Sequence, residues 1–191
     1  MTAWISIISE GDADSKLKSA LNMARTPHDT VDNVMKVHSL RPSTMKGHYL
    51  LYQAVLHDEA NTLPPWLQEV IGSYVSILNN CDYSYANHWK NAKYLISDPP
   101  RSKQIERALQ ARDPSAAFSG KELELLIYAE KLTLFPAEIK KESISALRKL
   151  GFDDGQILEA NQIICYFNYV NRSLNGLGVT TSGDKIGFYE E

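Results

Sequence analysis

Residues 63–89 of this chain, LPPWLQEVIGSYVSILNNCDYSYANHW, decide its fold. They include two formally charged side chains, Glu69 and Asp82, although charged residues make up 23% of the whole chain. A segment with so few charges is seldom solvated, and we therefore predict that most of it is buried. Pro64 and Pro65 suit the start of one helix, and a second helix is predicted to begin near Cys81.

The first of these two helices is predicted to have two different faces. Its apolar residues cover about half of the helix circumference; they are Trp66, Leu67, Val70, Ile71, Tyr74, Val75 and Leu78. Glu69 lies outside that arc, among uncharged and mostly small residues: Gln68, Gly72, Ser73 and Ser76. Composition alone would place a glutamate at the surface. The small neighbours suit the close approach of a second helix or subunit, so we predict that Glu69 is sandwiched.

The second helix is predicted to place three reactive side chains on one stripe. Cys81, Ser84 and His88 follow one another at spacings of three and four residues, which gives one face of a helix with about 3.6 residues per turn. Asn79 or Asn80 is the predicted N-cap, which would place Cys81 in the first turn, where the helix dipole favours an anion. A helix N-terminus or an imidazolium lowers a thiol pKa from about 8.5, and the thiolate is then a nucleophile.

These residues resemble a motif of the alkylhydroperoxidase D-like families, within the carboxymuconolactone decarboxylase superfamily. Those families have a glutamate and, twelve residues further on, the motif Cys-x-x-Cys-x-x-x-His at the start of a buried helix. Glu69, Cys81 and His88 keep that spacing here. The resemblance implies a catalytic site in which Cys81 reacts and the carboxylate and imidazole handle protons. Glu69 would hold the imidazole in one tautomer or take a proton through water.

Ser84 departs from the family motif. In the family, the cysteine at this position is expected to attack the peroxide, and the earlier cysteine resolves it as a disulfide. A serine forms no disulfide, so the two-thiol cycle does not carry over. Ser84 is a candidate catalytic residue with Cys81, His88 and Glu69, but its simplest role is to fill the space of the missing cysteine. Tyr83 is a candidate substrate-binding residue, and packing in the core or an interface is its alternative role.

The resemblance covers most of the chain and is greatest to the peroxidase-related branch of the superfamily. Three further stretches carry it: HSLRPSTMKGHYLLYQAVL at 38–56, LLIYAEKLTLFP at 125–136 and GFDDGQILEANQIICYFNYVNRSLNGLGV at 151–179. It implies an all-α, single-domain, multi-helix bundle that forms a homo-oligomer. We predict one domain over residues 1–191, with a core at about 34–179 and with the N-terminal helices and the C-terminal tail as appendages.

The hydrophobic pattern of the remaining chain also predicts helices. They are expected at about 15–25, 31–38, 42–56 and 101–111, after a capping box at Ser119 and Glu122, from Pro136 to Leu150, and at about 157–174 after a cap at Asp153 or Asp154. Gly151 and Gly178 are placed where helices end. Strand patterns are absent, so the predicted class is all-α, and the tail to residue 191 has no clear pattern.

Composition narrows the classes of partner. A net charge of −3 and a pI of about 6.0 give no electrostatic reason to bind nucleic acid or an anionic membrane. No apolar run approaches the roughly 20 residues that span a bilayer, and the N-terminus lacks the basic region of a signal peptide. Cys81 and Cys165 fit a reducing compartment, so a cytoplasmic protein is expected, with Cys165 as inert core. The histidines outside the motif are not spaced as metal ligands, and no metal or cofactor is expected.

Three functions are compatible with the sequence. The first is a peroxidase-related, antioxidant oxidoreductase in which Cys81 reduces a hydroperoxide and becomes a sulfenic acid, with Glu69 and His88 as proton relay and an external thiol as reductant. The second is non-redox acid–base chemistry of the carboxymuconolactone decarboxylase type, in which the same pair acts on a small carboxylate. The third is a helical oligomer with a decayed site. They are ranked in this order.

Overall fold

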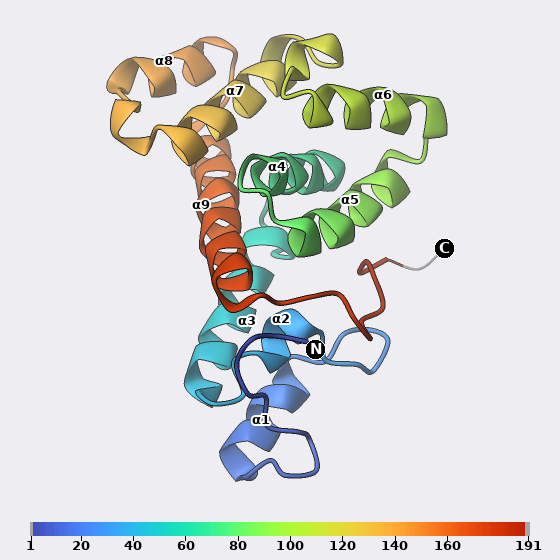
Figure 1. Ribbon diagram of the computed structural model, residues 1–191. Helices are drawn as coiled ribbons and strands as arrows, with labels where there is room; N and C mark the ends of the chain where they lie inside the picture. Colours follow the sequence, from blue (N-terminus) through green and yellow to red (C-terminus); the bar gives the residue numbers. More distant parts are fainter. Residues whose placement is uncertain (1, 190–191) are drawn as a thin grey trace.

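The computed structural model describes residues 2–189, and its regular elements are helices (Figure 1). In chain order they are α1 (Ser15–Met23), α2 (Asn33–Lys36), α3 (Pro42–Leu56), α4 (Pro65–Leu78), α5 (Asp82–Ile96), α6 (Pro99–Gln110), α7 (Gly120–Leu134), α8 (Lys141–Lys149) and α9 (Asp154–Leu177). Short 3-10 helices precede α7 at Pro114–Ala116 and α8 at Pro136–Glu138. No strand occurs in residues 2–189, and the all-α prediction is confirmed.

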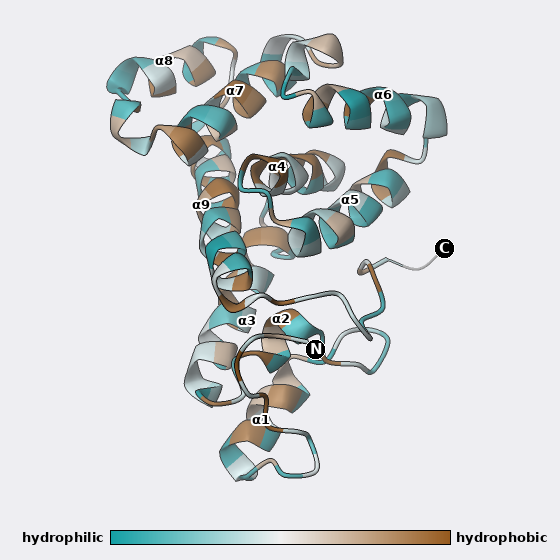
Figure 2. Ribbon diagram, viewed as in Figure 1, coloured by the Kyte–Doolittle hydropathy of each residue, from teal (hydrophilic) through white to brown (hydrophobic). Residues whose placement is uncertain are grey.

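Helix α4 is the central element, and it packs against α5, α7 and α9 (Figures 1 and 2). Eleven of its fourteen residues are buried. The small-residue face is covered by α5 and α9, with Gly72 against the ring of Phe167. Glu69 on that face is 3% exposed. The prediction that a second helix approaches this face and sandwiches Glu69 is therefore confirmed.

The predicted helix ends agree with the structure at some positions and differ at others. Asp153 caps α9 through a capping box with Gln156, and Pro42 occupies the first turn of α3, as predicted. Ser119 is the N-cap of α7, but its side chain makes no capping hydrogen bond, so the capping box predicted there is wrong. Pro136 begins a 3-10 helix, and α8 starts five residues later, at Lys141.

The N-terminal helices form a second, smaller apolar cluster. It joins α1, the segment before α2 and the start of α3 through Leu17, Leu21, Val31 and Met45. This cluster lies at one end of the molecule, and α8 lies at the other (Figure 1). The division into one domain with N-terminal and C-terminal appendages stays a prediction.

The segment after α9 folds back over the body of the protein. Residues 179–189, which we call the C-terminal strap, run from the end of α9 across to α5 and pass the N-terminal helices (Figure 1). The carboxylate of Asp184 accepts hydrogen bonds from the Tyr83 hydroxyl at 2.6 Å and from the Asn33 backbone N–H at 3.0 Å. The segment without a clear sequence pattern is thus held by polar contacts to α2 and α5.

Candidate active site

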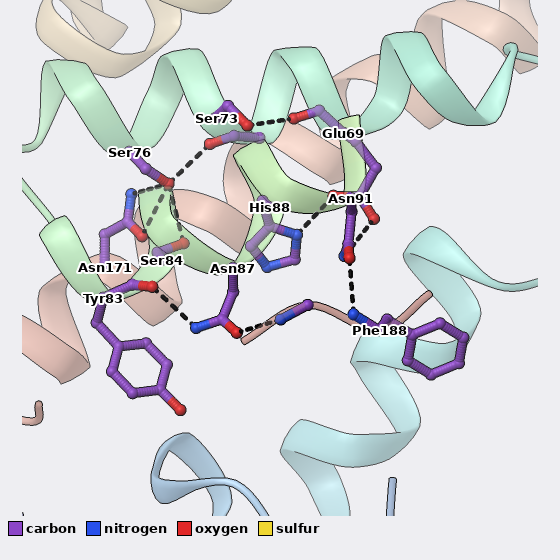
Figure 3. Close-up of polar contacts among 12 residues, drawn as sticks. Glu69, Ser73, Ser76, Tyr83, Ser84, Asn87, His88, Asn91, Asn171 and Phe188 are labelled. Carbon is purple, nitrogen blue, oxygen red and sulfur yellow. Dashed lines mark hydrogen bonds and ion pairs between the residues drawn. The ribbon is translucent and has the colours of Figure 1, made fainter. Parts of the chain in front are cut away.

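Glu69 and His88 form a buried acid–base pair between α4 and α5 (Figure 3). Nδ1 of the imidazole lies 2.7 Å from Oε2 of the carboxylate, and the two side chains are 13% and 4% exposed. An ionised carboxylate can only accept a hydrogen bond, so Nδ1 carries the proton of this contact, and whenever the imidazole is neutral Nε2 is its unprotonated nitrogen. In Figure 3 this second nitrogen faces away from the carboxylate.

The C-terminal strap supports this pair through an asparagine. Nδ2 of Asn91 donates to Oε1 of Glu69 at 3.1 Å, and Oδ1 of the same amide accepts from the Phe188 backbone N–H at 2.7 Å (Figure 3). One turn earlier on α5, the Gly187 backbone N–H donates to Oδ1 of Asn87 at 3.1 Å. Because a backbone N–H can only donate, the strap fixes the amide of Asn91 with its NH₂ group toward the carboxylate.

The imidazole lines a cavity of about 400 Å3. Sites for small organic molecules usually enclose about 300–1,000 Å3. Aromatic side chains from α3, α9 and the strap form much of its wall, and its lining includes Tyr52, Tyr83, Ser84, His88, Tyr166 and Phe188. A ring of Phe167 packs edge-on against His88, with 4.5 Å between ring centroids. The pair therefore combines a proton-transfer group with space for a small ligand.

Ser84 lines the cavity but belongs to a separate cluster of hydroxyl and amide groups. Its Oγ lies 2.9 Å from Oγ of Ser76, which in turn donates to the Gly72 carbonyl at 2.7 Å. The amide of Asn171 lies 3.4 Å from the same Ser76 oxygen. Ser84 is 2% exposed; both of its expected roles, filling the space of a cysteine and taking part in catalysis, stay predictions.

Cys81 does not line the cavity in this structure, in contrast to its predicted role. It is 1% exposed, and burial raises the pKa of its thiol to about 11, with a further contribution from the Asp82 charge, although the Ser84 backbone amide lowers it. The predicted first-turn position is wrong: Cys81 is itself the N-cap of α5. Asn79 and Asn80 end α4 instead of starting α5, and Asn80 has the positive φ of 51° typical of a helix end.

Cys165 was predicted to be inert core, and the structure places it at the surface. Burial still raises its thiol pKa, but the side chain is accessible.

We expect iodoacetamide at pH 8 to modify the native protein at Cys165 and not at Cys81. A thiol with a pKa near 11 is ionised in only about one molecule in a thousand at that pH, and the thiolate is the reactive form. Intact-mass spectrometry should show one adduct before denaturation and two in urea. The Cys165→Ala variant should show almost none before denaturation. Rapid modification of Cys81 in the native variant would contradict the burial of its sulfur.

Tyr83 lines the cavity, but its hydroxyl is already engaged. It donates to Asp184 at 2.6 Å and accepts from the Val34 backbone N–H at 3.1 Å. Burial, followed by the Asp184 charge and hydrogen bond, raises its pKa far above that of a free tyrosine. Its ring can still contact a ligand, whereas its hydroxyl holds the strap.

Within residues 2–189, no group of three His, Cys, Asp or Glu side chains is arranged to hold a metal ion. Each helix in residues 2–189 is too short or too polar to cross a lipid bilayer.

Sequence reasoning missed the supports of the acid–base pair. Asn91 follows His88 by three residues and Ser84 by seven, so the stripe that contains Ser84 and His88 continues to it. That spacing was a usable signal. The contacts of Phe188 and Asp184 had no comparable signal, because they join segments about one hundred residues apart.

The all-helical architecture is of the class of the alkylhydroperoxidase AhpD core. An AhpD-core structure of an uncharacterized peroxidase-related protein from Ralstonia eutropha superimposes with a TM-score of 0.82, at 17% identity over 96% of this chain and 94% of that chain. A peroxidase-related protein from Silicibacter gives 0.80, at 21% identity over 96% and 93%. At these identities the likeness establishes the fold.

A third solved structure shows the same fold with a small ligand. A cysteine-to-alanine variant of the debrominase Bmp8, in complex with 2,3,4-tribromopyrrole, superimposes with a TM-score of 0.75 at 16% identity, over 96% of this chain and 94% of that chain. No family model and no curated protein matches the sequence.

Proposed function

We propose that this protein is an enzyme that transfers protons to and from a small, largely apolar substrate, with His88 as the group that meets the substrate. The observation that carries the proposal is the 2.7 Å contact between Nδ1 of His88 and the buried carboxylate of Glu69, on an imidazole that lines a cavity of about 400 Å3. General acid–base catalysis by a positioned side chain contributes about 100- to 10,000-fold.

The carboxylate determines which nitrogen of His88 acts. Its hydrogen bond holds the proton on Nδ1, so Nε2 accepts a proton from the substrate as a general base. When Nε2 becomes protonated, the adjacent carboxylate stabilises the imidazolium. The proton is then available for return to another atom of the substrate. This sequence describes chemistry of the non-redox kind, such as decarboxylation or lactone isomerisation, and it uses no thiol.

A thiol peroxidase is the second candidate. The peroxidase-related descriptions of two proteins with this fold favour it. It requires the Cys81 sulfur to reach a hydroperoxide, to attack as a thiolate and to be regenerated from the sulfenic acid by an external thiol. Burial of Cys81 and its raised pKa oppose each of these steps, so we rank this hypothesis second, in the reverse of the order expected from the sequence. A sulfenate-specific probe that modifies Cys81 after addition of peroxide would restore the first ranking.

A base in such a cavity can be tested without knowledge of the natural substrate. The test reaction is the base-catalysed elimination of 5-nitrobenzisoxazole to 2-cyano-4-nitrophenolate. We expect the wild-type protein to accelerate this reaction above buffer, and His88→Ala to lose the acceleration by at least about 100-fold, as for removal of a general base. Release of the coloured phenolate gives the rate.

Cys81→Ala is the matched control, because it alters a second candidate residue at the N-terminus of the same helix. Its rate should equal that of the wild type within about twofold, since base catalysis of about 100-fold or more resides in His88. A wild-type rate no greater than that of His88→Ala would overturn the proposed function. Loss of the rate in Cys81→Ala alone would favour the thiol mechanism.

Other expectations from the sequence remain proposals. We propose a cytoplasmic homo-oligomer, and the exposure of Leu50 and Leu158 at 59% and 60% supports association through apolar surface. An external thiol reductant is needed only if the peroxidase hypothesis holds.

A further inference from the structure

A second hydrogen-bond chain, buried at its inner end, leads from the cavity to the surface and is not used by the Glu69–His88 pair. The hydroxyl of Tyr166, on α9, lies 3.0 Å from Nε2 of His48, on α3. Nδ1 of His48 lies 3.1 Å from Nε2 of His38, and Nδ1 of His38 lies 2.8 Å from the hydroxyl of Thr44. Thr44 is exposed and donates to the Arg41 carbonyl at 2.8 Å.

The contact of Thr44 at the surface end determines which group donates and which accepts in every hydrogen bond of this chain. A carbonyl oxygen only accepts, so Thr44 uses its one proton on Arg41 and accepts from Nδ1 of His38. Nε2 of a neutral His38 is then the acceptor for Nδ1–H of His48. Burial lowers the pKa of both imidazoles, that of His48 to about 3 with a contribution from His38, so both are neutral near pH 7.

With its Nδ1 protonated, neutral His48 has one remaining nitrogen, Nε2, which can only accept. Tyr166 must therefore donate its hydroxyl proton to His48. Tyr166 also lines the cavity, and the Glu69 charge contributes to its raised pKa after burial and Tyr169, which is consistent with its position near the acid–base pair. The hydroxyl oxygen of Tyr166 can therefore accept a hydrogen bond from a ligand in the cavity but has no proton left to donate to it.

We propose that Tyr166 determines substrate specificity as an obligatory hydrogen-bond acceptor, and that the substrate carries a hydroxyl or N–H group on a small apolar body. His48 and His38 are positioning residues, because they act on the substrate through the orientation of the tyrosine hydroxyl. The inference rests on the proposed function in one respect, namely that this cavity holds the substrate. The inference adds a hydrogen-bond donor to the description of the substrate, which the Glu69–His88 pair alone does not specify.

The tautomers can be measured without any ligand. In ¹⁵N-resolved NMR spectra of the full chain at pH 7, we expect His48 and His38 each to be protonated at Nδ1 and unprotonated at Nε2. A protonated Nε2 on His48 would overturn the proposal, because Tyr166 would then be free to donate its proton into the cavity.

The consequence for binding is tested with phenol, which keeps its hydroxyl proton at pH 7, and with anisole, in which a methyl group replaces that proton. We expect the wild type to bind the phenol about 3- to 10-fold more tightly than the ether, the effect of one hydrogen bond. Tyr166→Phe should reduce this ratio to about one. His48→Leu, which frees the tyrosine proton, should favour the ether relative to the wild type, and His48→Gln, whose carbonyl can accept that proton, should restore the preference for the phenol.

Tyr169→Phe is the matched control. The ring of Tyr169 packs edge-on against His48, with 5.6 Å between ring centroids, but the Tyr169 hydroxyl takes no part in the hydrogen-bond chain. We expect it to keep the wild-type ratio. A ratio unchanged in Tyr166→Phe overturns this inference and leaves the proposed function intact. If the protein shows no elimination activity but the binding ratio of phenol to ether is as expected, the proposed function is overturned and Tyr166 remains the hydrogen-bond acceptor.

Discussion

Glu69→Gln is expected to lower the rate of 5-nitrobenzisoxazole elimination by at least about 100-fold, although the side chain keeps its shape. Asn91 donates to one oxygen of the carboxylate and is itself held by the strap. The glutamine must therefore keep its carbonyl toward Asn91 and turn its NH₂ group toward His88. Nδ1 of the imidazole then becomes an acceptor, the proton moves to Nε2, and the base that faces the cavity is lost.

Glu130→Gln provides the control for this substitution. Glu130 accepts a hydrogen bond from Tyr74 of α4, so it is a second carboxylate that contacts the same helix without lining the cavity. The elimination rate of Glu130→Gln should equal that of the wild type. NMR of the His88 ring in Glu69→Gln should show the proton on Nε2. A normal rate together with a proton on Nδ1 would show that the carboxylate does not set the tautomer.

Gly72→Ala is expected to destabilise the protein by about 1–3 kcal/mol, the usual cost of overpacking a core. A Cβ at this position would overlap the ring of Phe167, which is fully buried. The same ring packs against His88, so its displacement should also lower the elimination rate. Urea denaturation should show a lower midpoint with an unchanged slope.

Gly47→Ala is the matched substitution for Gly72→Ala. Gly47 lies within α3, and no atom lies close to the position of an added Cβ. Alanine should stabilise the helix there by about 0.5–1 kcal/mol. Equal effects of the two alanines would show that the contact between α4 and α9 is looser than the structure indicates.

The sequence predicted most of the fold because its helices are separated by strong local signals. Prolines and caps such as Pro42 and Asp153 act over a few residues, and the small face around Gly72 indicated a close helix contact. The predicted burial of Glu69 depended on those neighbours and was correct. Local signals were sufficient for these features because they depend on residues within one or two helical turns.

The candidate site was predicted in part. The pairing of Glu69 with His88 followed from the family spacing, and the structure brings the two side chains together. The reactivity of Cys81 stays a prediction, but the first-turn position on which it depended is wrong, because the chain turns at Asn80 and Cys81 is the N-cap of α5. The cavity and the His48–Tyr166 contact depend on α3 and α9 meeting across 118 residues of sequence. Periodicity within one helix holds no information about such a contact.

The C-terminal strap has a consequence for synthesis on the ribosome. Asn91 and the carboxylate beside it are made early, but the backbone amide that orients Asn91 belongs to Phe188, which follows every helix of the chain. A nascent chain can therefore bury α4 before its proton-transfer group has a defined orientation. The proposed acid–base pair would gain its defined orientation only after residue 188 has left the exit tunnel, so a nascent chain without the strap could be folded and still lack that orientation.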